Sequence, residues 1–170
     1  MAPLVRRSWH PRGHPPVLYQ RTRSHQKVSA IAALTVSPSR DQVRLYFRLH
    51  PDVNITASLV MEFLRHLIKQ LDGPIVLVWD RLLAHRAKKV QTFIRDTPGF
   101  SDHFLPPYAP ELNPVENVWC YLKMNPLSNR PFLDVVSLAG TARSHGRSIQ
   151  RKQTLLRSFI EHTPLALCLH

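Results

Sequence analysis

One short apolar run strongly limits the folds open to this chain. Residues 75–79, IVLVW, contain no polar side chain, and Asp80 follows them directly. A run of this length is expected to be a strand buried on both faces, as in a sheet that is covered by helices on both sides. A basic helical segment at residues 86–96 and a short strand candidate at residues 101–105 come next. This order predicts a parallel strand–helix–strand unit.

The segments around this unit also carry local signals. Residues 27–37 and 42–50 are rich in β-branched and aromatic side chains, and the turn signal PSRD between them predicts a β-hairpin. Residues 56–71 repeat large apolar side chains every four positions, which predicts an amphipathic helix with Thr56 as its N-cap. Two more helical stretches lie within residues 131–162. Together these elements indicate an α/β domain with a mixed sheet flanked by helices on both faces.

The net charge favours a polyanionic partner. Lys and Arg total 23 against 11 Asp and Glu, which gives +12 over 170 residues. Because each phosphate that a cationic side chain neutralises releases condensed counterions, nucleic acid is the first candidate partner; a solubility charge and a structural role of the ribosomal type are the alternatives. Residues 1–40 contain no acid and mix basic with aromatic side chains, which suits either nucleic-acid contacts or a solvated arm. The candidate nucleic-acid contacts are Arg6, Arg7, Trp9, Arg12, Arg21, Arg23, Lys88, Lys89 and Lys123.

Composition and cysteine spacing exclude several other classes of protein. A hydrophobic content of 44% is enough for a sizeable core in one domain, or in one domain with a tail. Cys120 and Cys168 have no metal-ligand spacing, so neither a disulfide framework nor a zinc site is expected. No apolar run is long enough to span a membrane, and the first residues lack the apolar core of a signal peptide. We therefore expect a cytoplasmic protein that makes no membrane contact.

Two acids are the candidates for chemistry. Asp80 ends the apolar strand, and ligands of α/β sheets gather at the carboxyl ends of parallel strands; a strand-end Asp can equally cap a turn. Glu116 follows the proline-rich stretch LPPYAPELNP, at the third position of a helix predicted over residues 114–124. With Asn113 as N-cap and Pro114 at the first helical position, Glu116 also fits a capping box. If the two carboxylates converge, they suit Mg²⁺ and a phosphodiester substrate.

The stretches VLVWDRLLAH and FLPPYAPELNPVENVWCYLK resemble the DDE transposase domain of the mariner superfamily, in its bacterial insertion-sequence branch. The resemblance extends backwards through LVRRSWHPRGHPPVL, SAIAALTVS, LYFRLHPDVN and FLRHL. It implies a ribonuclease H-like fold and DNA strand cleavage and joining that depend on Mg²⁺, with Mn²⁺ as an alternative. Asp80 then matches the second catalytic acid and metal ligand, and Glu116 matches the third. His85 matches a histidine that supports the site or contacts DNA, or is a helix-start histidine without such a part, and Asn113 supports the start of the helix.

The resemblance also implies a missing part. In this family the first catalytic acid ends a central strand before the block that resembles LVRRSWHPRG, yet no acid precedes Asp41 here. Asp41 and Asp52 lie in predicted loops and do not match that motif. The expectation is therefore an N-terminally truncated catalytic domain that lacks its first, central strand and is inactive as this chain. The hairpin and the parallel pair would then have no strand between them, which exposes strand edges and apolar surface.

Three functional hypotheses follow. The first is a transposase catalytic domain that acts on transposon ends and target DNA, as a homo-oligomer or together with a full-length transposase. The second is a non-catalytic DNA-binding remnant, and the third is a ribonuclease H-like nuclease in which Glu62 completes the site. The expected organisation is a basic segment at residues 1–26, a catalytic core at residues 27–125 and a helical tail at residues 126–170.

Overall fold

The predicted hairpin is the longest sheet element of the protein. A computed structural model describes residues 12–13, 27–125, 127–129, 132, 134–165 and 169. Strands β1 (Val28–Val36) and β2 (Val43–Pro51) pair antiparallel, from Val28 opposite Pro51 to Val36 opposite Val43. The turn between them is closed by Ser37, whose hydroxyl accepts hydrogen bonds from the backbone N–H groups of Asp41 and Gln42. The hairpin prediction is confirmed.

The parallel strand–helix–strand unit forms the second sheet. Strands β3 (Ile75–Trp79) and β4 (Phe100–Phe104) pair in parallel, and helix α2 (Lys88–Arg95) connects them. Helix α1 (Ala57–Ile68) precedes the unit and starts where predicted, because the Thr56 side chain accepts a hydrogen bond from the Leu59 N–H. Side chains of α1, α2, β3 and β4 form one hydrophobic core, with Val60, Leu64, Trp79, Val90, Ile94 and Phe100.

Three further helices cover the hairpin. A 3-10 turn, η1 (Pro110–Leu112), leads into α3 (Pro114–Met124), and α4 (Val135–Gln150) and α5 (Gln153–Glu161) follow. Their apolar side chains form a second core with β2, made of Val43, Leu45, Val118, Leu122, Ile149, Leu156, Phe159 and Ile160. Gln153 also fixes α5 to β2, because its side chain accepts from the Val43 N–H and donates to the Val43 carbonyl. The helices of the predicted tail thus share a core with the hairpin.

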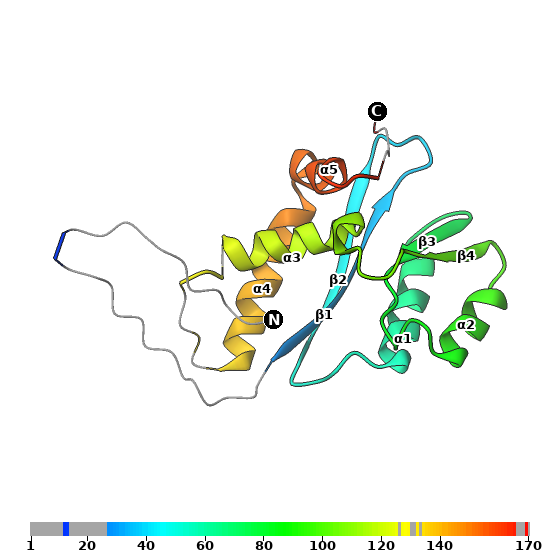
Figure 1. Ribbon diagram of the computed structural model, residues 1–170, viewed down its shortest axis with the longest axis horizontal. Helices are drawn as coiled ribbons and strands as arrows, with labels where there is room; N and C mark the ends of the chain where they lie inside the picture. Colours follow the sequence, from blue (N-terminus) through cyan, green and yellow to red (C-terminus); the bar gives the residue numbers. More distant parts are fainter. Residues whose placement is uncertain are drawn as a thin grey trace.

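The four strands belong to two separate sheets. Figure 1 shows the hairpin with α3, α4 and α5 on one side and the β3–β4 unit with α1 and α2 on the other. Within the described ranges no strand lies between β1 and β3. The expected loss of a central strand stays a prediction, since most of residues 1–26 lie outside the described residues. No helix in the same ranges is both long and apolar enough to cross a membrane.

The prediction that β3 is buried on both faces is wrong. Ile75, Leu77 and Trp79 pack into the core formed with α1 and α2. Val76 and Val78 point the other way and remain 65% and 52% exposed. The apolar run therefore has only one covered face, because the described elements do not cover the other.

Candidate active site

Asp80 lies at the carboxyl end of β3, at the rim of the sheet. Its Oδ1 atom accepts a hydrogen bond from the Leu82 N–H at 3.0 Å and lies 2.8 Å from His85 Nδ1. The His85 hydrogen bond, with smaller help from the Leu82 N–H, holds the pKa of Asp80 below its usual value, against the opposing effect of partial burial. Asp80 therefore caps the turn that follows β3, and its side chain is also kept as an oriented carboxylate.

His85 is held in place by a network that spans three elements. Its ring stacks on the Trp79 indole, with centroids 4.4 Å apart. The Trp79 Nε1–H donates to Asp102 Oδ2 on β4 at 3.1 Å. Gln91 on α2 donates to the same Asp102 oxygen at 3.2 Å and to the His85 carbonyl at 3.1 Å. Asp102 thus fixes the indole on which His85 stacks, and Gln91 fixes the backbone of the loop that contains His85.

Glu116 lies in the first turn of α3, and the start of this helix explains its position. The Asn113 side chain accepts a hydrogen bond from the Val115 N–H at 3.2 Å, and Pro114 occupies the first helical position. In a capping box Glu116 would accept from the Asn113 N–H, but that group donates to the Pro110 carbonyl at 3.0 Å. Helix initiation therefore does not use the Glu116 carboxylate.

Asp80 and Glu116 both line one cavity between the two sheets. Glu116 is a solvent-exposed residue, yet surrounding residues of the protein partly bury its carboxyl group. This loss of hydration raises the pKa of the carboxyl group. The Asp80 charge raises this pKa further, and the Lys123 charge opposes the shift. Because the Asp80 charge acts on Glu116, although less than burial and Lys123 do, the two carboxylates lie within electrostatic reach of each other.

A carboxylate pair of this kind suits a hard divalent cation. Mg²⁺ is bound in proteins by one or two carboxylates and completes its shell with water and phosphate oxygens, and a cation would also relieve the repulsion between Asp80 and Glu116. The described part of the chain contains no group of three or more His, Cys, Asp or Glu side chains that could hold a metal ion. The donor set therefore fits a divalent ion but supplies only two acids.

Three of the other acids, Glu62, Asp41 and Asp52, are engaged elsewhere. Glu62 forms an ion pair with Arg48 of β2 and does not line the cavity. Asp41 accepts hydrogen bonds from the Ser37 and Ser39 hydroxyls in the hairpin turn. Asp52 accepts from the Lys27 N–H beside the end of β2. The nuclease hypothesis that uses Glu62 thus gains no support from the geometry.

The basic residues predicted from the sequence are spread over several places. Arg6, Arg7, Trp9, Arg21 and Arg23 lie outside the described residues, and Arg12 is exposed. Lys88 and Lys89 are exposed at the start of α2, where Lys89 donates to the Ser58 hydroxyl at 2.7 Å. Lys123 lies on α3 and acts electrostatically on Glu116. Among the candidates that the structure describes, Lys123 alone contributes to the pKa shift of a carboxylate of the pair.

The structure adds one basic surface that the sequence analysis did not single out. Arg143, Arg147 and Arg151 are all exposed, at four-residue spacing along α4 and at its C-cap. Such spacing places side chains on one helix face, about 6 Å apart along the axis. None of the three forms an ion pair with a described residue. The signal in the sequence was the regular Arg spacing together with the absence of acids from residue 135 to 160.

The arrangement of helices and strands is that of a ribonuclease H-like α/β fold. The chain aligns with the Mos1 mariner paired-end complex with Mn at a TM-score of 0.65 and 16% identity, over 95% of this chain and 48% of that one. The Mos1 strand transfer complex aligns at a TM-score of 0.63 and 16% identity, over 94% and 47% of the two chains. The chain thus spans about half the length of these structures.

The family follows from the sequence itself. Residues 2–139 match the DDE superfamily endonucleases, and the chain belongs to this family. A curated relative, the uncharacterized protein y4pE/y4sA of Sinorhizobium fredii (strain NBRC 101917 / NGR234), is 68% identical over 31 residues, which are 18% of this chain and 23% of the relative. The recognition made from the motifs around Asp80 and Glu116 is thereby confirmed at the level of the family.

Proposed function

We propose that this chain is part of a DNA transposase and carries two of the carboxylates used in metal-dependent cleavage and joining of DNA strands. The observation that carries the proposal is the convergence of Asp80 and Glu116 on one cavity, in a chain with the fold and the family of DDE transposases. Because no group of three or more acids, histidines or cysteines among the described residues could hold a metal ion, the chain is expected to be inactive by itself.

Each residue of the site has a distinct part in this proposal. Asp80 and Glu116 would hold Mg²⁺, with Mn²⁺ as an alternative; one of the Mos1 structures is described as a complex with Mn. When bound, such ions activate the attacking oxygen and stabilise the leaving oxygen of a phosphodiester. His85 is a positioning residue, since it holds the Asp80 carboxylate through its Nδ1 atom. Asn113 fixes the helix start that presents Glu116.

The proposed partner is DNA, both transposon ends and target. A related structure is described as a Mos1 transposase paired-end complex with the left transposon end. The net charge of +12 and the exposed Arg143, Arg147 and Arg151 offer this chain phosphate contacts. A homo-oligomer, or a complex with a full-length transposase, would bring two DNA ends together.

A second candidate function is a non-catalytic DNA-binding protein derived from a transposase. The observation in its favour is that Asp80 and Glu116 have no third partner in a group that could hold a metal ion among the described residues. Loss of a bridging carboxylate weakens metal binding, and misplacement of the reacting groups lowers rates by orders of magnitude. Both candidates predict DNA binding, and they differ in whether Asp80 and Glu116 still bind a divalent ion.

The test combines metal binding with DNA cleavage. Titration of the protein with Mn²⁺, followed by the electron paramagnetic resonance signal of the free ion, is expected to show a site that weakens at least tenfold in Asp80→Asn and in Glu116→Gln. Glu62→Gln is the matched control and is expected to bind Mn²⁺ like the wild type, because Glu62 pairs with Arg48. Equal Mn²⁺ binding by wild type and both site variants would contradict the proposed carboxylate site.

Cleavage is measured on supercoiled plasmid with Mg²⁺ or Mn²⁺. The expected result is nicking at the background level, while gel shifts with the same DNA show binding by the wild type and both site variants. Nicking by the wild type that disappears in Asp80→Asn and Glu116→Gln would show a complete active site and overturn the expected inactivity. Absence of any metal site together with normal DNA binding would favour the second candidate.

A further inference from the structure

Arg81 follows Asp80 directly, and its guanidinium group is fixed at the rim where β3 and β4 end. The Leu105 N–H donates to the Trp79 carbonyl, so the Leu105 carbonyl is the next acceptor in the parallel ladder. Because β3 ends at Trp79, this acceptor is met by a side chain, the Arg81 Nε–H, at 3.1 Å. The head group of Arg81 is therefore joined to the end of the sheet.

A row of stacked rings supports the same guanidinium group. Its Cζ atom lies over the Phe104 ring, 5.9 Å from the ring centroid. The Phe104 ring stacks with the Trp79 indole at 5.8 Å between centroids, and the indole stacks with the His85 ring at 4.4 Å. The two ends of the row are thus Arg81 and His85, and His85 contacts the Asp80 carboxylate. One packed row positions an acid of the candidate site and a cation beside it.

The rest of the guanidinium group has no partner among the described residues. Arg81 is exposed, and with these residues it forms no ion pair and no hydrogen bond other than the one to Leu105. It contributes to the pKa shift of neither Asp80 nor Glu116, so it does not neutralise either carboxylate. The N–H groups on its Nη1 and Nη2 atoms suit a phosphate, which Arg binds through two parallel hydrogen bonds.

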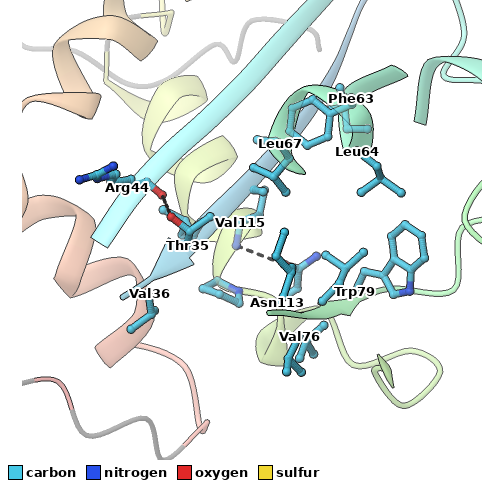
Figure 2. A pocket seen from close by; sticks show the side chains of 18 of the residues that line it. Thr35, Val36, Arg44, Phe63, Leu64, Leu67, Val76, Trp79, Asn113 and Val115 are labelled. Carbon is cyan, nitrogen blue, oxygen red and sulfur yellow. Dashed lines mark hydrogen bonds between the residues drawn. The ribbon is translucent and has the colours of Figure 1, made fainter. Parts of the chain in front are cut away.

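The position of Arg81 relative to the cavity favours a phosphate on a polymer. The cavity has a volume of about 700 Å³ and is lined by both acids of the pair, whereas Arg81 lies outside its walls. Figure 2 shows Trp79 at the end of β3 and Asn113 and Val115 at the start of α3 around this space. A ligand that reaches both the carboxylates and Arg81 must therefore extend across the rim, as a nucleic-acid strand does.

We propose that Arg81 binds a backbone phosphate of DNA at the rim beside Asp80 and so fixes the path of the strand across the cavity. The inference rests on the proposed function, because it takes DNA as the ligand. It does not require a metal ion. Since the Leu105 carbonyl and the Phe104 ring already hold the guanidinium group, little side-chain entropy is lost when it binds a phosphate.

A matched pair of neutral variants tests the contact. Binding of the full chain to a labelled duplex is measured at several salt concentrations with a chelator present. Arg81→Gln is expected to weaken binding about tenfold and to reduce the slope of log affinity against log salt by about 0.9, the value for one phosphate. Lys69→Gln removes the same charge from the exposed C-cap of α1 and should bind almost like the wild type. Equal effects of the two variants would contradict the proposal.

A conservative variant separates the held fork from its charge. Arg81→Lys keeps the positive charge but loses the planar head group that bonds to Leu105 and stacks on Phe104. It is therefore expected to weaken binding about threefold or more, because an ammonium group cannot make the two parallel bonds. Wild-type affinity in Arg81→Lys would show that charge alone is enough, and the proposed fork would be wrong.

Nuclear magnetic resonance distinguishes a phosphate contact from a purely structural role of Arg81. The ¹⁵N-labelled full chain is titrated with an oligothymidylate, again with a chelator, and the Arg81 Nε–Hε signal is identified by its absence from Arg81→Lys. We expect this signal to shift saturably, whereas an arginine that only joins β3 to β4 would leave it unchanged and overturn the inference. DNA binding that does not involve Arg81 would contradict the inference alone, and no DNA binding by the wild type would contradict the proposed function as well.

Discussion

At the scale of single residues, Glu116 couples the stability of the protein to pH. Partial burial and the nearby Asp80 charge raise its pKa, so the folded state favours the protonated carboxyl group. The contribution of Glu116 to stability is therefore most favourable at low pH and is lost as pH rises through the raised pKa. Without divalent ions, Glu116→Gln is expected to raise the melting temperature at pH 7, by roughly 1–2 °C.

The pH dependence of this difference is the internal control. Wild type and Glu116→Gln are melted by circular dichroism from pH 3 to pH 8 with a chelator present. At the acidic end both side chains are neutral, so the difference in melting temperature should vanish. A variant that is less stable than the wild type at pH 7 would show that the ionised carboxylate stabilises the fold, and that the repulsion inferred for this site is absent.

The residues of the candidate site differ in how far the sequence could predict them. Asp80, Glu116 and Asn113 follow from local signals, namely a strand end and a helix start, and the structure places them as those signals indicate. Asp102 and Gln91 could not be found this way. They act on Trp79 and His85 through contacts between β4, α2 and the end of β3, and such contacts depend on how the elements pack.

At the scale of elements, Gly146 allows α4 to approach β2 closely. A Cβ atom built on Gly146 would lie 2.5 Å from the Cζ atom of Phe47, far inside van der Waals contact. Phe47 is partly buried and packs against the core that includes Leu45 and Ile149, so its ring can make room only by giving up some of these contacts. Gly146→Ala is therefore expected to destabilise the fold by about 1–3 kcal/mol, as other overpacked contacts do.

The same helix provides the matched control for this prediction. Gly140 has no atom within 4 Å of a built Cβ atom, so Gly140→Ala should be neutral or stabilising by up to about 1 kcal/mol through helix propensity. Urea unfolding of both variants measures the difference. Adding Phe47→Leu should make Gly146→Ala less costly, since the clashing ring is removed. Equal stabilities of the two alanine variants would contradict the close packing of α4 on β2.

The sequence predicted the helices and strands themselves better than it predicted how deeply each of them is buried. The hairpin, the caps at Thr56 and Asn113, and the parallel strand–helix–strand unit depend on short-range signals and are present in the structure. The burial of β3 depends on what lies beyond its own sequence. An apolar run predicts a strand with two faces to cover, but whether both faces are covered depends on distant elements, and here Val76 and Val78 stay exposed.

At the scale of the whole molecule, the basic surface of α4 should govern how DNA binding depends on salt. Arg143, Arg147 and Arg151 project from one helix face at a spacing of about 6 Å, and the exposed side chains form no ion pair with described residues. If each contacts one phosphate, each contributes about 0.9 to the slope of log affinity against log salt. Changing all three to Gln should reduce that slope by about 2–3 and weaken binding to unrelated DNA sequences alike.

A control must show that the reduced slope comes from the α4 arginines and not simply from a lower net charge of the protein. The triple change Arg65→Gln, Lys69→Gln and Arg95→Gln also removes three positive charges, from exposed positions of α1, its C-cap and α2, on the other side of the hairpin in Figure 1. Fluorescence anisotropy with a labelled duplex from 50 to 200 mM salt should show a reduced slope for the α4 variant and a near-normal slope for this control. Equal slopes would mean that DNA responds to the total charge of the protein, and the α4 face would then have no special part in binding.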